Sequence, residues 1–233
     1  MNEIALVTGA SRAQGLGFAV AREFATRGHH VVLAGRDLAR TRALAEQLTA
    51  EGLPADAVRL DVTVAADIAA GAEFLHTRFG RLDVLVNNAS TMPDFTALSL
   101  LDADRAEARA AYDVDVLGTL ALVQACLPLL RAAPAARIVN VSSAAAGQLT
   151  AGTGGVRAPG HSLAKYALDA LTTALAAELR ESGIAVTGVD PGSVATHPER
   201  GDDADDRSPA EAALDVVEAA GVPISAAGRA PLA

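Results

Sequence analysis

Short apolar runs alternate with longer amphipathic segments along most of the chain. The apolar runs show no polar alternation, which is typical of parallel strands buried on both faces. They lie at residues 4–7, 30–34, 57–60, 84–87, 137–141 and 185–189. The segments between them have helical periodicity and lie at residues 16–27, 38–51, 64–79, 102–132 and 162–182. This alternation predicts an α/β fold with a doubly wound parallel sheet, three layers deep, in which residues 1–233 form a single domain.

Composition supports a folded chain and argues against several kinds of partner. Hydrophobic residues make up 51% of the 233 residues and charged residues 20%, which argues against disorder. The formal net charge of -9 would repel a phosphate backbone, so we expect no nucleic-acid partner. The chain starts without a signal-peptide pattern, and no apolar run reaches the ~18 residues of a membrane span, so we expect no membrane partner. A single cysteine, Cys126, fits a reducing compartment, and we expect a cytoplasmic protein.

A glycine-rich turn joins the first predicted strand to the first predicted helix. It reads Thr8-Gly9-Ala10-Ser11-Arg12-Ala13-Gln14-Gly15-Leu16-Gly17. Glycines let the chain turn sharply and bring backbone N–H groups onto a diphosphate, and the start of the helix adds the positive end of its dipole. In this place the turn predicts a Rossmann-type dinucleotide site. We expect the contacts to come from Gly9, Ser11, Arg12, Gly15, Leu16 and Gly17.

The end of the second predicted strand indicates which dinucleotide is bound. An NAD-selective site usually has an acidic residue there to accept the ribose 2′-hydroxyl, but this chain has Gly35. Arg36 follows, and we expect it to clamp a 2′-phosphate together with Arg12. The sequence therefore favours NADP(H) over NAD(H).

The segment from Thr8 to Arg12 resembles the start of the short-chain dehydrogenase/reductase family. That family usually spaces its glycines Gly-x-x-x-Gly-x-Gly, whereas here five residues separate Gly9 from Gly15 and the turn is longer. The resemblance covers roughly residues 3–215 and implies further contacts to the dinucleotide. They are Asp61 against the adenine, its neighbour Val62, Asn88 and Ala89 after the fourth strand, and Pro191, Gly192, Val194 and Thr196 after the sixth.

The resemblance also implies a catalytic centre, in which two positions differ from the family. Members carry Asn, Ser, Tyr and Lys: Tyr exchanges a proton with the substrate oxygen, Lys lowers the Tyr pKa and holds the ribose, Ser positions the substrate oxygen, and Asn supports a water relay. Ser143 and Lys165 match the Ser and Lys positions. His161 stands where Tyr is expected, one helical turn before Lys165, and Asp115 stands where Asn is expected.

Exchanging Tyr for His changes the acid that this position offers. Tyr titrates near ~10 and His near ~6.5, and the acid form of His is a cation. Lys165 should lower the pKa of His161, and Asp115 should offset this effect if it is close. We interpret the two differences as coordinated. The alternative is that both positions drifted in a protein with little redox activity.

Three functions fit these residues. The favoured one is an NADP(H)-dependent carbonyl reductase or alcohol dehydrogenase, with His161 as proton donor or acceptor. The second is a non-redox enzyme, such as a cyclase, dehydratase or isomerase, that uses His161 and Asp115 as acid and base. The third is an NADP(H)-binding protein without turnover. Ser143 lacks the Gly-x-Ser-x-Gly setting of a hydrolase, and the other histidines are not spaced as a metal site.

The sequence predicts the substrate and the oligomeric state in less detail than the fold and the cofactor. Three irregular segments are expected to line the pocket of a small, partly apolar substrate: 91–101, 147–160 and 193–208. Ala-rich faces on the predicted helices 102–132 and 162–182 predict a homo-oligomer, either a dimer or a tetramer. Residues 222–224 allow at most a stub of a last strand.

Overall fold

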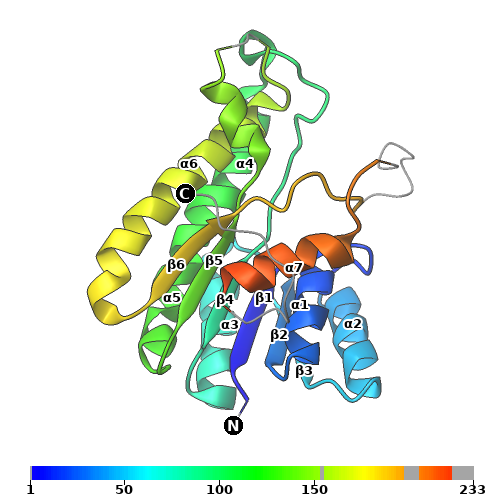
Figure 1. Ribbon diagram of the computed structural model, residues 1–233, viewed down its shortest axis with the longest axis vertical. Helices are drawn as coiled ribbons and strands as arrows, with labels where there is room; N and C mark the ends of the chain where they lie inside the picture. The colour runs from blue at the N-terminus through cyan, green and yellow to red at the C-terminus, as the bar shows by residue number, and fades with distance from the viewer. Residues whose placement is uncertain (1, 153–154, 197–204, 222–233) are drawn as a thin grey trace.

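The computed structural model describes residues 2–152, 155–196 and 205–221, which build one sheet covered by helices (Figure 1). Neighbouring strands pair in parallel in the order β3-β2-β1-β4-β5-β6. The strands are β1 Ile4–Thr8, β2 His30–Gly35, β3 Ala55–Arg59, β4 Val84–Asn87, β5 Arg137–Val141 and β6 Ala185–Val189. The predicted doubly wound α/β fold is confirmed, and its strand order reverses between β1 and β4.

Both faces of the sheet are buried, because alternate residues of each strand enter one of two cores. In β1, Ala5 and Val7 join the core formed with α1, α2 and α7, whereas Ile4 and Leu6 join the core formed with α3, α5 and α6 (Figure 1). The helices are α1 Leu16–Thr26, α2 Leu38–Ala50, α3 Ala65–Phe79, α4 Arg105–Tyr112, α5 Thr119–Arg131, α6 Pro159–Leu179 and α7 Pro209–Ala219. This two-sided burial explains why the strands read as continuous apolar runs.

The segment predicted as a single helix over 102–132 is divided in the structure. Asp104 caps the start of α4, because its side chain accepts hydrogen bonds from the first backbone N–H groups of that helix. Between α4 and α5, Asp113–Gly118 forms a π-helix. Gly118 lies against Val62, and a Cβ at Gly118 would come within 2.8 Å of the valine Cγ2. Such π-helical turns are frequent at functional sites, and this one carries Asp115.

Taken as one run, Arg105–Arg131 is long and apolar enough to cross a membrane, with a mean hydropathy of 1.6 over its apolar window. Half of that window is buried inside the fold. In addition, α5 packs against α3, and α4 packs against α6. A core helix passes the same test of length and composition, so packing explains this run. The absence of a membrane partner stays a prediction.

The carboxyl-terminal half differs from the prediction mainly where helices begin. A 3-10 helix, Ala144–Leu149, enters the stretch predicted to be irregular. Pro159 starts α6 earlier than predicted, and the capping box of Ser208 and Glu211 starts α7. The last strand predicted near 222–224 lies outside the described residues.

Candidate active site

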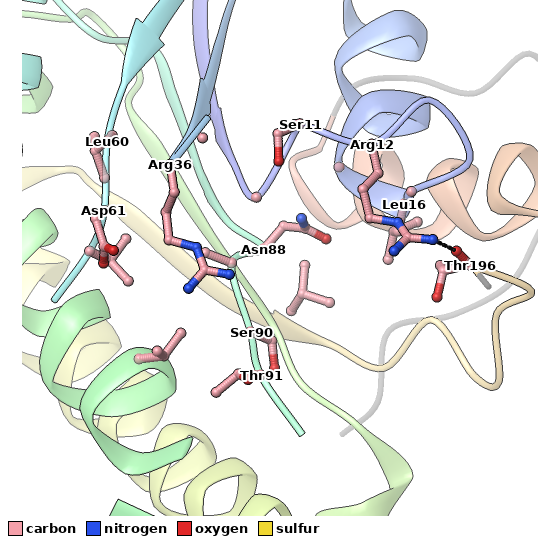
Figure 2. A pocket seen from close by; sticks show the side chains of 18 of the residues that line it. Ser11, Arg12, Leu16, Arg36, Leu60, Asp61, Asn88, Ser90, Thr91 and Thr196 are labelled. Carbon is pink, nitrogen blue, oxygen red and sulfur yellow. Dashed lines mark hydrogen bonds between the residues drawn. The ribbon is translucent and has the colours of Figure 1, made fainter. Parts of the chain in front are cut away.

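A pocket of about 400 Å³ opens where β1 and β4 end, at the point where the strand order reverses (Figure 2). Open parallel sheets bind their ligands at this kind of position. Most lining residues lie at or after the carboxyl ends of the strands, and the others lie in the first turns of α1 and α6 or in the π-helix Asp113–Gly118. They are Gly9, Ser11, Arg12, Gly15, Leu16, Gly17, Gly35, Arg36, Leu60, Asp61, Val62, Thr63, Asn88, Ala89, Ser90, Thr91, Val114, Val141, Ser142, Ser143, His161, Lys165 and Thr196.

Gly9 and Gly17 let two stretches of backbone meet at Asn88. Gly9 has a left-handed φ of 68°, and a Cβ on it would lie 2.9 Å from the Cα of Ala89. A Cβ on Gly17 would lie 2.6 Å from Asn88 Nδ2. That Nδ2 donates a hydrogen bond of 2.8 Å to the carbonyl of Thr8, which fixes the amide in place. The backbone around Gly9 and Gly17 therefore forms a cradle, and a side chain at either glycine would fill it.

The first turn of α1 borders this cradle. Its N-cap is Gly15, which has no side chain to accept the N–H groups, and the first turn contains no acidic residue. Unsatisfied N–H groups and the positive end of the helix dipole favour an anion at this position. Because Leu16 and Gly17 line the pocket, a diphosphate placed there would meet these N–H groups.

Arg12 and Arg36 line different parts of the pocket (Figure 2). Arg36 extends beside Asp61, whereas Arg12 extends toward Thr196 and donates a hydrogen bond of 2.9 Å from Nη2 to its carbonyl oxygen. The two guanidinium groups therefore turn toward different partners. Arg36 lies at the end of β2, where the ribose of a dinucleotide is expected.

The end of β2 has no room for an acidic side chain. A Cβ on Gly35 would lie 2.7 Å from Thr41 Oγ1 and 2.9 Å from the Cβ of Ser11. Either contact is shorter than real Cβ atoms allow, so a side chain at Gly35 would displace α2 or the glycine turn. Packing therefore excludes the acidic residue that NAD-selective sites usually carry there.

Asp61 lies at the edge of the same pocket and is held in its ionised form. Burial raises the pKa of Asp61, but hydrogen bonds from Thr63 and the charges of Arg36 and Arg59 together lower that pKa below its ordinary value. The carboxylate accepts from both the backbone N–H and the hydroxyl of Thr63, at 2.9 and 2.7 Å. Asp61 is therefore an acceptor for a ligand in this part of the pocket.

Lys165 is buried and doubly anchored. Its Nζ donates a hydrogen bond of 2.7 Å to the carbonyl of Val141 and forms an ion pair of 2.8 Å with Asp115 Oδ1. The other carboxylate oxygen of Asp115 accepts a long hydrogen bond from the Thr91 N–H. The ion pair thus connects the π-helix, which carries Asp115, with α6, which carries Lys165.

His161 lies in the first turn of α6, one helical turn before Lys165, and lines the pocket. Its Nδ1 lies 3.1 Å from the carbonyl oxygen of Thr91. A carbonyl only accepts, so Nδ1 carries a proton and Nε2 is the atom that gains or loses one. Burial lowers the pKa of His161, Lys165 lowers it further, and Asp115, Thr91 and Asp94 only partly oppose this. The neutral ring is therefore favoured more than in water.

Ser143 follows β5 and caps the 3-10 helix Ala144–Leu149, because its Oγ accepts from the Ala145 N–H at 3.2 Å. Its neighbour Ser142 donates a hydrogen bond of 2.5 Å to Asp169 on α6. Both serines line the pocket. The cap leaves the Ser143 hydroxyl proton for another acceptor, such as a substrate oxygen.

The structure brings most of the predicted site residues to one pocket. Ser143, His161 and Lys165 line it, together with the predicted glycine-turn residues and Arg36. Four predicted residues are not part of the lining of this pocket in the described part of the chain: Asp115, Pro191, Gly192 and Val194. Asp115 lies behind Lys165, as their ion pair shows. The carbonyl of Pro191 accepts a hydrogen bond of 2.8 Å from Arg207.

Some lining residues were not predicted individually. Thr91, whose carbonyl oxygen accepts a hydrogen bond from Nδ1 of His161, belongs to the segment 91–101 that was expected to line the substrate pocket. Ser142 adjoins the predicted Ser143 and Val141 ends β5 just before it, but neither was predicted as a site residue. Among residues 2–152, 155–196 and 205–221, no group of three or more His, Cys, Asp or Glu side chains is arranged to hold a metal ion.

A profile of the short chain dehydrogenase family matches residues 3–207. The chain belongs to the short-chain dehydrogenase family. This short-chain dehydrogenase is 33% identical over 210 residues to an uncharacterized oxidoreductase of Staphylococcus epidermidis, covering 90% of this chain and 86% of the relative. It is 37% identical over 201 residues to the trans-4-hydroxycyclohexanecarboxylate dehydrogenase of Sinomonas cyclohexanicum, covering 83% and 73%.

Among solved structures, this short-chain dehydrogenase is similar to a metagenomic short-chain oxidoreductase in complex with NADP. The TM-score is 0.77 at 32% sequence identity, and the match covers 95% of this chain and 91% of the other. The family match and these relatives identify the chain as an oxidoreductase of the short-chain dehydrogenase type.

Proposed function

We propose that this protein is an NADP(H)-dependent oxidoreductase that interconverts a carbonyl group and an alcohol of a small molecule, with His161 in the position of the family's tyrosine. The position of His161 carries the proposal. Its ring lines the dinucleotide-type pocket one helical turn before Lys165, and Thr91 fixes its Nδ1. The NADP complex of a similar oxidoreductase supports the choice of cofactor.

The residues present fit a nicotinamide dinucleotide. The cradle of Gly9 and Gly17 and the start of α1 suit the diphosphate, because backbone can approach closely only where no Cβ intervenes. Asp61 and Val62 would border the adenine, and Lys165 would hold the ribose. When bound, the cofactor supplies or accepts the hydride.

The preference for NADP(H) rests on the end of β2. Gly35 has no room for an acidic side chain, so no carboxylate at this position repels a phosphate. Arg36 follows directly and lines the pocket, and a guanidinium is well suited to a 2′-phosphate. Arg12 adds positive charge from the glycine turn.

His161 and Ser143 would perform the proton transfer. In carbonyl reduction, protonated Nε2 of His161 gives its proton to the substrate oxygen, while the hydroxyl of Ser143 donates a hydrogen bond to that oxygen. In alcohol oxidation, neutral Nε2 accepts the proton. Because burial and Lys165 lower the pKa of His161, the neutral ring dominates near neutral pH, and reduction should speed up as pH falls.

Asp115 makes a cationic acid tolerable beside Lys165. Two neighbouring cations in a dry pocket repel each other strongly, and Asp115 cancels the charge of Lys165 at 2.8 Å. The Lys165 ammonium has three N–H groups. Val141 accepts one of them and Asp115 lies beside the ammonium as its counter-ion, so Lys165 keeps an N–H group for a ribose hydroxyl.

We also propose that two copies of the chain pair through the outer surface of α4, the π-helix and α6. Four large apolar side chains lie exposed on these helices, at 40–49% of their surface: Tyr112, Leu117, Leu163 and Tyr166. Because α4 packs on α6, these side chains belong to neighbouring helices, and such patches favour association. Light scattering should give a dimer mass for the wild type and a monomer mass for Tyr166→Arg. A monomeric wild type would contradict this pairing.

The proposed activity is tested by following NADPH oxidation at 340 nm with a panel of small aldehydes and ketones. The wild type should oxidise NADPH with at least one of them, and His161→Ala should lose about 10²–10⁴-fold in rate, as expected for a lost general acid. Product formation without NADPH consumption would favour a non-redox enzyme instead. Binding of NADPH without any turnover across the panel would overturn the oxidoreductase proposal.

A further inference from the structure

Asp94, in the loop after β4, is a buried carboxylate outside the pocket lining. The residue is only 2% exposed, and its Oδ2 accepts a hydrogen bond of 2.5 Å from the backbone N–H of Gly160. Its Oδ1 is also buried and has no hydrogen-bond partner among the described residues. A buried, ionised oxygen without a donor is unfavourable, so a compensating positive charge nearby stabilises it.

The hydrogen bond from Gly160 makes Asp94 the cap of α6. The helix begins with Pro159, which has no N–H, and its N-cap Ala158 has a left-handed φ of 46° and supplies no side-chain cap. Asp94 provides the missing acceptor from 66 positions away in the sequence. A Cβ on Gly160 would lie 2.6 Å from Ala108 Cα on α4 and 3.0 Å from Asp94 Oδ2, so glycine permits this close approach.

The residue that follows Gly160 is His161, so the hydrogen bond from Gly160 to Asp94 holds the backbone one residue before the imidazole. Lys165 and Asp115 form an ion pair, and their charges cancel. With His161 neutral, the cluster of these four residues keeps the single negative charge of Asp94, and with His161 protonated the cluster is neutral. Burial lowers the pKa of His161 most, and Lys165 adds to that, while Asp115, the hydrogen bond to Thr91 and, to the smallest extent, Asp94 raise the pKa.

Other charges near the start of α6 are less effective. The helix α4 packs against α6 and carries Arg105, Glu107 and Arg109, which are exposed or half-buried and therefore screened by water. The 3-10 helix Ala144–Leu149 also packs against α6 and contains no ionisable side chain. Asp94 is thus the buried carboxylate beside His161 that no basic side chain of the cluster neutralises.

We propose that Asp94 is a positioning residue for His161: one carboxylate oxygen anchors the start of α6, and the other supplies the negative charge that favours the imidazolium over the neutral ring. The inference rests on the proposed function, in which the imidazolium is the proton donor. It predicts that Asp94 influences the protonation of His161 in the unliganded protein, with or without a substrate.

Asp94→Asn separates the two roles. The amide oxygen can still accept a hydrogen bond from the Gly160 N–H, because Asn is as good a cap as Asp, but the negative charge is lost.

Histidine Cε1–H resonances of the full-length protein would be followed from pH 4.5 to 8.5, with the His161 signal assigned through His161→Gln. Asp94→Asn should move the His161 midpoint to lower pH. The control Asp102→Asn removes an exposed carboxylate and should leave the midpoint in place. Equal midpoints in the wild type and Asp94→Asn would overturn the proposal.

A second measurement covers the case in which Asp94→Asn fails to fold. In the wild type, the side-chain carboxyl ¹³C signal of Asp94 should shift over the same pH range in which His161 titrates, and a flat signal over that range would overturn the proposal. Neither titration needs a substrate, so an enzyme inactive with NADPH would refute the oxidoreductase proposal and leave this test intact. NADPH oxidation by the wild type together with equal midpoints would refute the role of Asp94 alone.

Discussion

Nζ of Lys165 lies 2.8 Å from Oδ1 of Asp115, and the two side chains are only 4% and 0% exposed. The pair joins α6 to the π-helix Asp113–Gly118 in the interior of the protein. Desolvating two charges is costly, but breaking such a pair costs more, because it leaves one charge buried alone. The position of the Lys165 ammonium at the pocket therefore depends on Asp115.

Asp115→Ala should destabilise the protein by about 3–5 kcal/mol, because Lys165 would lose its buried partner. The measurement is the free energy of unfolding from urea titration. Asp113→Ala is the matched control in the same π-helix: Asp113 pairs with Arg109 at the surface, and this substitution should cost less than about 1 kcal/mol. Equal losses of unfolding free energy in the two variants would show that the buried pair stabilises the protein no more than the surface pair does.

Gly17→Ala should weaken NADPH binding by about 5–150-fold. Its Cβ would lie 2.6 Å from Asn88 Nδ2 and 2.7 Å from the carbonyl oxygen of Gly9, so the cradle has to open, at a typical cost of about 1–3 kcal/mol. Calorimetric titration with NADPH gives the Kd. Gly147→Ala is the control, because a Cβ there meets no atom within 4 Å. Unchanged affinity in Gly17→Ala would contradict the backbone cradle.

Arg36→Ala should weaken NADPH binding and leave NADH binding nearly unchanged. Losing hydrogen bonds to a charged phosphate costs about 1.5–3 kcal/mol, which corresponds to about 10–100-fold in Kd. The comparison uses both coenzymes and the exposed Arg42→Ala on α2, which makes the same change in net charge. An equal loss of affinity for NADPH and NADH in Arg36→Ala would show that Arg36 does not bind the 2′-phosphate.

The lowered pKa of His161 predicts how stability changes with pH. In the unfolded chain His has its ordinary pKa near ~6.5. Between the folded and unfolded pKa values, the unfolded chain binds more protons, so stability rises with pH across this window. As pH falls below the unfolded-state pKa of ~6.5, the wild type loses free energy of unfolding, because the buried His161 resists the proton that the unfolded chain binds. The loss in unfolding free energy between pH 7 and pH 5 should therefore be smaller in His161→Gln than in the wild type. His76→Gln, at an exposed position, serves as the control and should follow the wild type.

Most of the sheet could be predicted from sequence because its strands are buried on both faces. Strands such as β1 and β5 have no exposed residue, so they read as apolar runs with clear ends. The edge strand β3, Ala55–Arg59, is half-exposed along most of its length, and its predicted range 57–60 was accordingly displaced. Strands that are buried on both faces thus have ends that can be predicted from the sequence more accurately than those of an exposed edge strand.

The candidate site was only partly predictable. Spacing places His161 and Lys165 on one helical face, and the structure has both at the pocket. The sequence predicted that Asp115 would offset Lys165 if it lay close, and the two form an ion pair. It could not show that a π-helix places Asp115 behind the lysine, outside the pocket lining. Nor could it show that Asp94 caps α6, because that contact joins segments far apart in the chain.

The most direct test of the account is the pH dependence of NADPH oxidation by the wild type and by His161→Tyr with the same carbonyl substrate. If His161 is the proton donor, the wild-type rate should fall as pH rises past the His161 titration, because the neutral ring has no proton to give. His161→Tyr should sustain reduction to higher pH, since Tyr titrates near ~10. Identical profiles for the two proteins, or a wild-type rate that does not change between pH 5 and 9, would contradict the central role of His161.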